Sequence, residues 1–314
     1  MVDSHVDFLR TLSEDDKRKL TAKRDAPALV RLFIHLALIL TFALLIVWTR
    51  TTKSGLWALL LPPYGILLTF LFALSHECTH QTAFRRRWIN DISGHAIAPI
   101  IALPFIWFRY FHRAHHMYTN DPTKDPEIVG SGRPETWPAF LLYLSGWGYW
   151  SGEATVLLNN AFGTISYPYL PNHKHAIVRR EARVILGIYF ALALSIGVCC
   201  FLFPEVGKAS VSWLATLWII PLLIGQPFLR LFLLAEHGRC PHVANMLENS
   251  RTTFTSGLVR ALAWNMPYHS AHHCYPSVPF HQLPALHSRI SSHLKTTSNG
   301  YLEFNKVYVA QLRH

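Results

Sequence analysis

Residues 56–80 read LWALLLPPYGILLTFLFALSHECTH, an apolar stretch that runs directly into the histidine pair His76 and His80. The part over Leu56–Ser75 is long enough to cross about 30 Å of hydrocarbon as a helix, which takes about 20 residues. Neutral imidazole is the commonest metal-binding side chain in proteins. This stretch therefore predicts a membrane helix that ends at a metal site.

Three further apolar stretches have the length of a membrane span. They are Ala28–Trp48, Val184–Phe203 and Val211–Ala235, and the short segments Thr49–Gly55 and Pro204–Ser210 join the four spans into two hairpins. Charged residues make up only 15% of the chain, where a soluble domain has about 25%. The predicted fold class is therefore all-α, a polytopic membrane protein with four transmembrane helices in two hairpins.

The rest of the chain predicts a helical cap on one membrane-bound domain that covers residues 1–314. We expect residues 76–183 and 236–314 to form this cap, which carries the histidines. Ile92–Phe108 is apolar but contains Pro99 and Pro104, so we expect it to be re-entrant or interfacial. Trp137–Gly163 is rich in Trp, Tyr and Gly, a composition typical of a segment at headgroup depth.

The distribution of basic residues predicts the orientation. The two short segments between paired spans carry only Arg50, Lys53 and Lys208, and the other 26 of the 29 Lys and Arg residues lie elsewhere. Because cytoplasmic loops carry the excess of Lys and Arg, both termini and the metal site are expected to face the cytoplasm. The net charge of +11 then suits anionic lipid headgroups and an acidic protein partner better than nucleic acid.

Eight histidines fall into three short clusters. They are HECTH (His76 and His80), HRAHH (His112, His115 and His116) and HSAHH (His269, His272 and His273). On a helix, residues three and four positions apart share a face, so the histidines of each cluster project together. Eight ligands are more than one ion uses, and the clusters therefore predict a dinuclear metal centre.

The first cluster also has the HExxH form of a zinc protease, in which Glu77 would be the general base. That interpretation leaves both HxxHH clusters unexplained, and it remains the competing class, an intramembrane protease. Iron is favoured over zinc because two irons can take electrons and cleave O₂. Carboxylates near the clusters could accept the second N–H of a ligand histidine or simply face solvent; they are Glu77, Asp121, Asp125, Glu127 and Glu236.

The motifs resemble those of the membrane-bound fatty acid desaturase and hydroxylase superfamily. The matching stretches are HECTHQTAF (76–84), FRYFHRAHHMYTNDPTKDPE (108–127) and NMPYHSAHHCYPSVP (265–279), within a resemblance that covers about residues 56–285. The resemblance implies two non-haem Fe ions held almost entirely by histidines. It also implies a ninth ligand after the last span, for which His237 is the candidate; a helix-end histidine stabilised by the dipole is the alternative.

Two details of the resemblance differ or stay open. Some members carry an Asn-x-x-x-His pattern at the ninth ligand, whereas Leu233 stands in the place of that Asn here. Asn265, four residues before His269, either contacts a ligand histidine or caps a turn.

The resemblance implies that O₂ is activated and that a hydrogen is removed from an unactivated C–H bond of a lipid chain, most simply in fatty acyl desaturation. Hydroxylation, ketolation, or oxidative decarboxylation of a fatty acid to a terminal alkene would use the same centre. Electrons would come from a separate ferredoxin, rubredoxin or haem protein with its reductase. The candidate residues for docking this electron donor are Arg85, Arg86, Arg87, Arg179 and Arg180. The control of membrane topology and contact with lipid headgroups would also explain these arginines. Arg230 and Gln226, late in the fourth span, could bind the polar end of the substrate, although Arg230 could instead snorkel.

Overall fold

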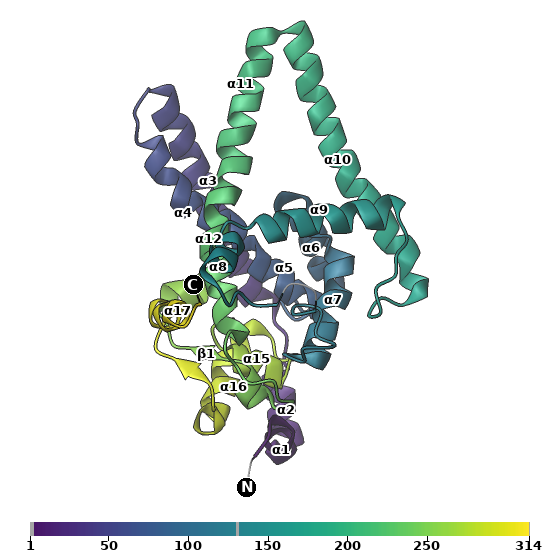
Figure 1. Ribbon diagram of the computed structural model, residues 1–314, viewed down its shortest axis with the longest axis vertical. Coiled ribbons are helices and arrows are strands. Elements are labelled where there is room, and N and C mark those ends of the chain that lie inside the picture. The colour runs from purple at the N-terminus through teal and green to yellow at the C-terminus, as the bar shows by residue number, and fades with distance from the viewer. Residues whose placement is uncertain (1–2, 130–131, 314) are drawn as a thin grey trace.

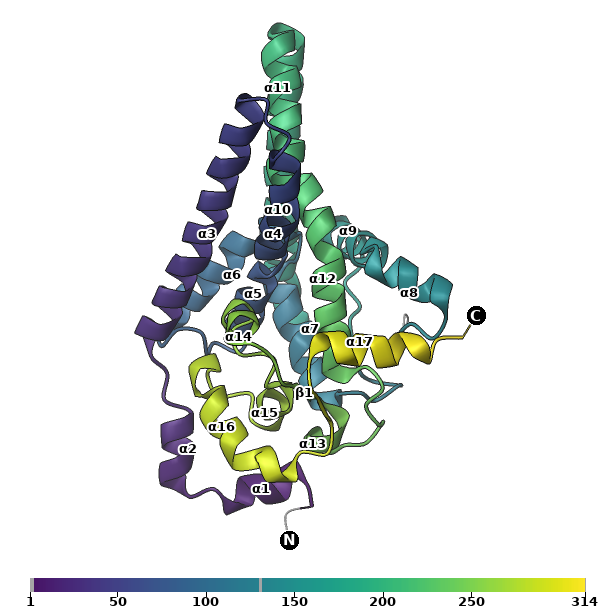
Figure 2. The same cartoon turned by 90° about the vertical axis from the view of Figure 1, so that its left-hand side faces the viewer.

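The structure is a computed structural model that describes residues 3–129 and 132–313. Four helical segments in this part of the chain are long and apolar enough to cross a membrane: Glu14–Thr51, Trp57–Thr79, Asn172–Leu202 and Pro204–His237. They form two hairpins whose tips point away from the small helices of the cap (Figures 1 and 2). The predicted all-α membrane fold with four spans is confirmed.

The first hairpin consists of α3 (Asp25–Thr51) and the pair α4 (Trp57–Thr69) and α5 (Leu71–Thr79). Pro62 and Pro63 lie inside α4. The helix is interrupted at Phe70, and α5 begins at the next residue. The second hairpin consists of α10 (His175–Leu202), α11 (Pro204–Leu214), a π-helical turn over Ala215–Ile219 and α12 (Ile220–His237). The last helix of each hairpin therefore ends at a predicted ligand. Helix α5 ends just before His80, and α12 ends at His237.

The second hairpin differs from prediction at its tip. The expected loop Pro204–Ser210 is instead the first part of α11, and only Phe203 separates this helix from α10. Proline is well suited to the first position of a helix, because its missing N–H would have no helical partner there and its φ is already helical. The fall in apolarity after residue 203 was therefore a poor sign of a loop.

Two glycines let the hairpins cross closely. A Cβ atom at Gly65 of α4 would overlap the carbonyl group of Pro221 in α12, and one at Gly225 would overlap the backbone of Gly65. Membrane helices commonly use small residues for such close approach. The crossing fixes α12 against α4, and so brings the end of α12 near the end of α5.

The stretch expected to be re-entrant or interfacial forms two helices, α6 (Arg87–Ile101) and α7 (Phe105–Tyr118), with a bend of 100° between them. The first turn of α7 is capped by the buried Glu181 of α10, whose carboxylate accepts hydrogen bonds from the backbone N–H groups of Phe105 (3.1 Å) and Ile106 (2.8 Å). A carboxylate at this position satisfies free donors and complements the helix dipole. It anchors the helix that carries the second histidine cluster.

The remaining elements surround this frame. Helices α8 (Trp137–Leu144) and α9 (Trp147–Phe162) follow α7, and α9 runs across the long helices (Figure 1). The cap contains α1 (His5–Thr11), α2 (Glu14–Leu20), α13 (Met246–Asn249), α14 (Gly257–Leu262), α15 (His269–Cys274), α16 (Leu283–Ile290) and α17 (Tyr301–Ala310). Short 3-10 turns cover Asn172–Lys174, Phe280–Gln282 and Ser291–His293. Among the described residues, β1 (Thr252–Thr253) and β2 (Thr297–Ser298) pair in parallel, with Thr252 opposite Thr297.

Candidate metal centre

Nine histidines from separate parts of the chain gather into two adjacent groups. The five-histidine group contains His76, His80, His112, His116 and His272, and the four-histidine group contains His115, His237, His269 and His273. Within each group, one ring nitrogen from every member lies within 4.8 Å of all the others. These nine residues are the eight cluster histidines and His237, so the structure brings together every residue named as a candidate ligand from the sequence.

The five-histidine group is built from three elements. His76 lies near the end of α5 and His80 follows it, His112 and His116 share one face of α7, and His272 lies on α15. The Nε2 atom of His112 lies 2.9 Å from Nε2 of both His80 and His116, and Nε2 of His116 lies 3.1 Å from Nε2 of His272. Imidazole nitrogens at this spacing could serve together as ligands of a single ion.

The four-histidine group converges in the same way. Nε2 of His237 lies 2.8 Å from Nε2 of His269 and 3.2 Å from Nε2 of His115. His115 precedes His116 on α7, and one residue turns a helix by about 100°. Adjacent histidines in the HxxHH cluster therefore point to different groups, and the same division separates His272 from His273 on α15.

Three of the four outer ring nitrogens in the four-histidine group have hydrogen-bond partners, whereas Nδ1 of His269 has none among the described residues. Nδ1 of His115 donates to the buried carboxylate of Asp125 (2.9 and 3.0 Å), and Nδ1 of His237 donates to the carbonyl oxygen of Asn249 (2.9 Å). Nδ1 of His273 lies 3.0 Å from Thr119 Oγ1, which itself donates to the carbonyl of His115. Each of these contacts holds the proton on Nδ1 and leaves the lone pair of Nε2 free for a metal.

Four members of the five-histidine group lack such partners. Within the described ranges, the buried Nδ1 atoms of His76, His112, His116 and His272 have no hydrogen-bond partner. The two groups therefore differ in support: the four-histidine group is held by a hydrogen-bonded frame and the five-histidine group mainly by packing.

Burial lowers the pKa of most of these imidazoles. It lowers the pKa of His80 to about 3, and it also lowers the pKa values of His269, His272 and His273, with neighbouring histidines adding to the shift. At His115 burial acts in the same direction, but the carboxylates of Glu127 and Asp125 outweigh it and raise the pKa. A neutral imidazole is the metal-binding form. Nine imidazole donors, in groups of five and four, fit two transition-metal ions, and imidazole suits iron as well as zinc, copper or nickel.

The carboxylates singled out in the sequence divide into two sets. Asp125 and Glu236 lie against histidines, with Oε1 of Glu236 3.2 Å from Nδ1 of His269. Glu127, also considered from the sequence, has Oε2 3.6 Å from Nδ1 of His115.

The other candidates contact different groups. Oε1 of Glu77 accepts from the backbone N–H of Phe280 (2.9 Å), and the side-chain amide of Asn265 donates to the carbonyl of Phe280 (2.9 Å). Asp121 caps Thr123 at the surface. Glu77 belongs to neither histidine group, and one of its oxygens is held by the backbone of Phe280.

Two functional contacts had no clear sequence signal. Thr119 and Asn249 hold the outer nitrogens of His273 and His237, and Asn249 is itself fixed by its amide, which donates to the carbonyls of Thr119 (3.1 Å) and Val243 (2.8 Å). Thr119 lies three residues after His116, so proximity could have suggested it. Asn249 lies 12 residues beyond His237 in a short helix, and no motif marks it.

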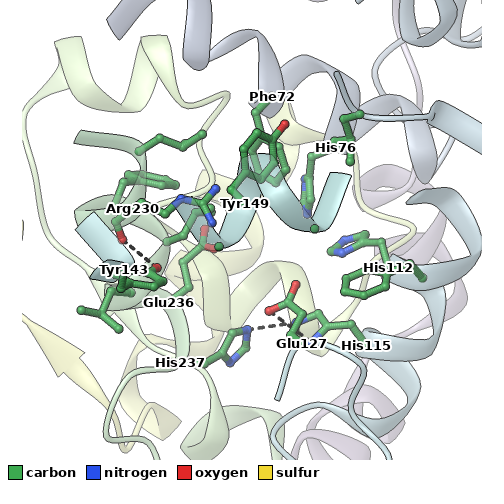
Figure 3. Close-up of a pocket in the computed structure, with 18 of the residues that line it drawn as sticks. Phe72, His76, His112, His115, Glu127, Tyr143, Tyr149, Arg230, Glu236 and His237 are labelled. Atoms are coloured by element: carbon green, nitrogen blue, oxygen red, sulfur yellow. Dashed lines mark hydrogen bonds and ion pairs between the residues drawn. The ribbon is translucent and has the colours of Figure 1, made fainter. Parts of the chain in front are cut away.

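A cavity of about 720 Å³ adjoins both groups (Figure 3). His76 and His112 of the five-histidine group line it, as do His115, His237 and His269 of the four-histidine group. Much of the remaining wall is apolar and aromatic, including Phe72, Trp107, Phe108, Phe111, Phe232 and Leu233. Such a wall suits a hydrocarbon chain laid beside the histidines.

An apolar cavity against clustered histidines, inside a helical membrane frame, fits an integral membrane enzyme whose histidines could hold metal ions. The chain belongs to the fatty acid desaturase family, whose sequence model matches residues 54–305. It is 23% identical to an sn-1 oleoyl-lipid 12-desaturase of Anabaena variabilis, over 82% of this chain and 80% of the relative.

Relatives from plants show similar identity. The chain is 24% identical to an endoplasmic reticulum omega-6 fatty acid desaturase of Brassica juncea, over 79% of this chain and 68% of the relative. It is also 24% identical to a Delta(12)-acyl-lipid-desaturase of Punica granatum, over 82% and 69% of the two chains. These matches agree with the family resemblance of the three histidine clusters.

Proposed function

We propose that the protein is an O₂-dependent di-iron desaturase of fatty acyl chains. The observation that carries this proposal is the division of nine histidines into groups of five and four, in each of which one ring nitrogen per residue lies within 4.8 Å of the others. One iron would bind in each group. The family membership supports desaturation, and the relatives are named as desaturases of acyl lipids.

When bound, the two irons would supply O₂ chemistry in which O₂, two electrons and two protons, with two hydrogens from the chain, give a double bond and two waters. The protein's own residues position the reactants. Asp125, Asn249 and Thr119 orient the histidines of the four-histidine group through their outer N–H groups. Fixed ligand rings keep the site in one geometry through the reaction.

The cavity wall would hold the substrate chain and exclude water. Phe72 and Phe108 pack together with ring centroids 5.6 Å apart, and the ring of Phe108 stacks on that of His112 at 5.5 Å. Both phenylalanines line the cavity. A methylene chain lying against them would pass next to the five-histidine group, where a dry environment protects reactive species from side reactions.

Electrons would reach the site from a separate small redox protein with its reductase, a ferredoxin, rubredoxin or haem protein. The exposed side chains of Arg85, Arg86 and Arg87 lie just after the first histidine cluster and would favour an acidic partner. The distribution of Lys and Arg supports a cytoplasmic site and termini. Hydroxylation, ketolation and oxidative decarboxylation remain alternative outcomes of the same hydrogen removal.

Mass spectrometry of lipids and free fatty acids from cells that carry the protein tests the reaction. Cells with His273→Ala, which removes one ligand of the four-histidine group, are the control. A product lighter by two hydrogens supports desaturation. A gain of one oxygen, or a terminal alkene shorter by one carbon, would assign the alternative reactions, and identical lipid profiles in both cell lines would refute the proposal.

A further inference from the structure

The cavity has a charged group inside the membrane-spanning part of the protein. Arg230 lies in α12, two helical turns before His237, and both residues line the cavity. Figure 3 shows the guanidinium of Arg230 between Tyr149 and Glu236. Seven residues of helix rise about 10 Å, so the arginine lies about that distance along α12 from the four-histidine group. It is therefore a fixed positive charge at a set distance from the proposed irons.

The guanidinium of Arg230 has donors to spare. Its buried Nε has no hydrogen-bond partner within the described residues, and the ion pairs found among those residues do not include Arg230. The guanidinium lies 5.8 Å from the ring centroid of Tyr143 and 5.0 Å from that of Tyr149. Stacking on aromatic rings leaves the N–H groups, which lie in the guanidinium plane, free to bind an acceptor.

The neighbouring hydroxyl groups are already used. Tyr143 donates to the backbone carbonyl of Arg230 itself (3.0 Å), and Tyr149 donates to the carbonyl of Ile101 (2.6 Å). These bonds hold both rings against the arginine, and among the described residues neither phenol oxygen accepts a hydrogen bond from its N–H groups. The two tyrosines thus position the guanidinium for a ligand.

No acidic group among the described residues lies within ion-pair distance of Arg230, neither Glu236, which Figure 3 shows beside it, nor Glu153. Glu153 is 9% exposed and lines the cavity, and its Oε2 has no partner among the described residues. Burial raises the pKa of Glu153 to about 8, so this carboxyl favours the uncharged form at pH 7. A cation inside a membrane protein without a direct ion pair is costly, and an anionic ligand in the cavity would relieve that cost.

We propose that Arg230 binds the carboxylate of a free fatty acid and thereby sets which carbons of the chain lie beside the histidines. An ester-linked chain offers only neutral carbonyl oxygens and leaves the charge on Arg230 uncompensated. The inference rests on the proposed function for the oxidation of the bound chain, whereas carboxylate binding itself needs no iron.

Equilibrium binding of oleate and of methyl oleate to the purified protein in detergent micelles tests this assignment. Charge-assisted hydrogen bonds to one carboxylate should make oleate bind about 10- to 100-fold more tightly than its neutral ester. Arg230→Gln should remove this preference and leave the affinity for methyl oleate unchanged, which also shows that the cavity is intact. Arg230→Lys should keep part of the preference, and Arg86→Gln, at an exposed position outside the cavity, should keep all of it.

Equal affinity of the unaltered protein for both probes, or tighter binding of the ester, would overturn the proposal. So would an Arg230→Gln protein that still prefers oleate, or one that loses both probes to the same extent. The test is separate from the proposed reaction. An intact preference for oleate in a protein that desaturates nothing would count against the desaturase function alone.

Discussion

Replacing Asp125 by Asn should weaken iron in the four-histidine group. The Asp125 side chain is fully buried, and its two oxygens accept from Nδ1 of His115 and from the backbone N–H groups of Asn120 (2.7 Å) and Glu127 (3.0 Å). An amide at this position loses the negative charge. It also turns an NH₂ group toward one of these donors, because every partner of the carboxylate is an N–H.

The size of the effect follows from the bonds that are lost. A hydrogen bond to a charged group contributes about 1.5–3 kcal/mol, and each 1.4 kcal/mol changes an equilibrium constant about tenfold. The change at His115 should therefore lower iron affinity about 10- to 100-fold, the range typical for outer-shell partners of metal ligands. The five-histidine group has no contact with Asp125 and should keep its iron.

Iron per chain, measured after dialysis against increasing concentrations of a chelator, reads this effect directly. Asp125→Asn should release one of two irons at a chelator concentration about 10- to 100-fold lower than the unaltered protein. Asp121→Asn is the matched control, because Asp121 caps Thr123 at the surface. Circular dichroism on the same samples separates iron loss from unfolding. Equal retention of both irons by the two variants would refute the role given to Asp125.

Three further predictions follow from the site, the burial of its histidines and the cavity. Glu77→Gln should keep both irons and most of the activity, because Glu77 bonds to the backbone of Phe280; complete loss of activity with the fold retained would favour the protease mechanism. Acidification from pH 7 to pH 5 should lower the thermal unfolding temperature. The reason is that histidines of the unfolded chain take up protons below about pH 6.5, whereas His80 stays neutral in the folded protein down to about pH 3. An unfolding temperature that rises with acid would contradict this. Gly152→Leu should reduce turnover of long chains more than short ones, because Gly152 lines the cavity and a side chain there meets open space; Gly187→Leu, on α10 outside the cavity, should leave the chain-length profile unchanged.

The sequence predicted the membrane frame well because spans are set by length and apolarity. Four stretches of about the right length, interrupted by polar turns, were sufficient to place the four long helices. The exception is the tip of the second hairpin, where Pro204 starts a helix instead of a loop. The polar residues there mark the end of the apolar stretch, but they do not mark a loop. The backbone instead begins a new helix at Pro204.

The candidate ligands were also visible in the sequence, but their division was not. The spacing of His112, His115 and His116 indicates a shared helical arc, and it does not reveal which neighbours each ring meets. That depends on how α7 approaches α5, α12 and α15. For the same reason, the sequence did not reveal Asn249. It holds His237 through its backbone carbonyl, a contact that any residue type could make.

Arg230 shows a third kind of limit. A basic residue near the end of a span is usually explained by snorkelling toward the interface, and the sequence offered no reason to prefer a ligand. The structure instead places Arg230 in the cavity wall with tyrosines against its guanidinium. Gln226, the other residue proposed from the sequence to bind the polar end of the substrate, is buried beside Gly146. It is not part of the cavity wall.

Elemental analysis of the purified protein tests the central claim most directly. Five imidazoles in one group and four in the other predict two irons per chain, and His272→Ala and His273→Ala should each weaken a different one. A single zinc ion with no iron, retained when His272 is replaced, would contradict the assignment of the nine histidines to a pair of irons.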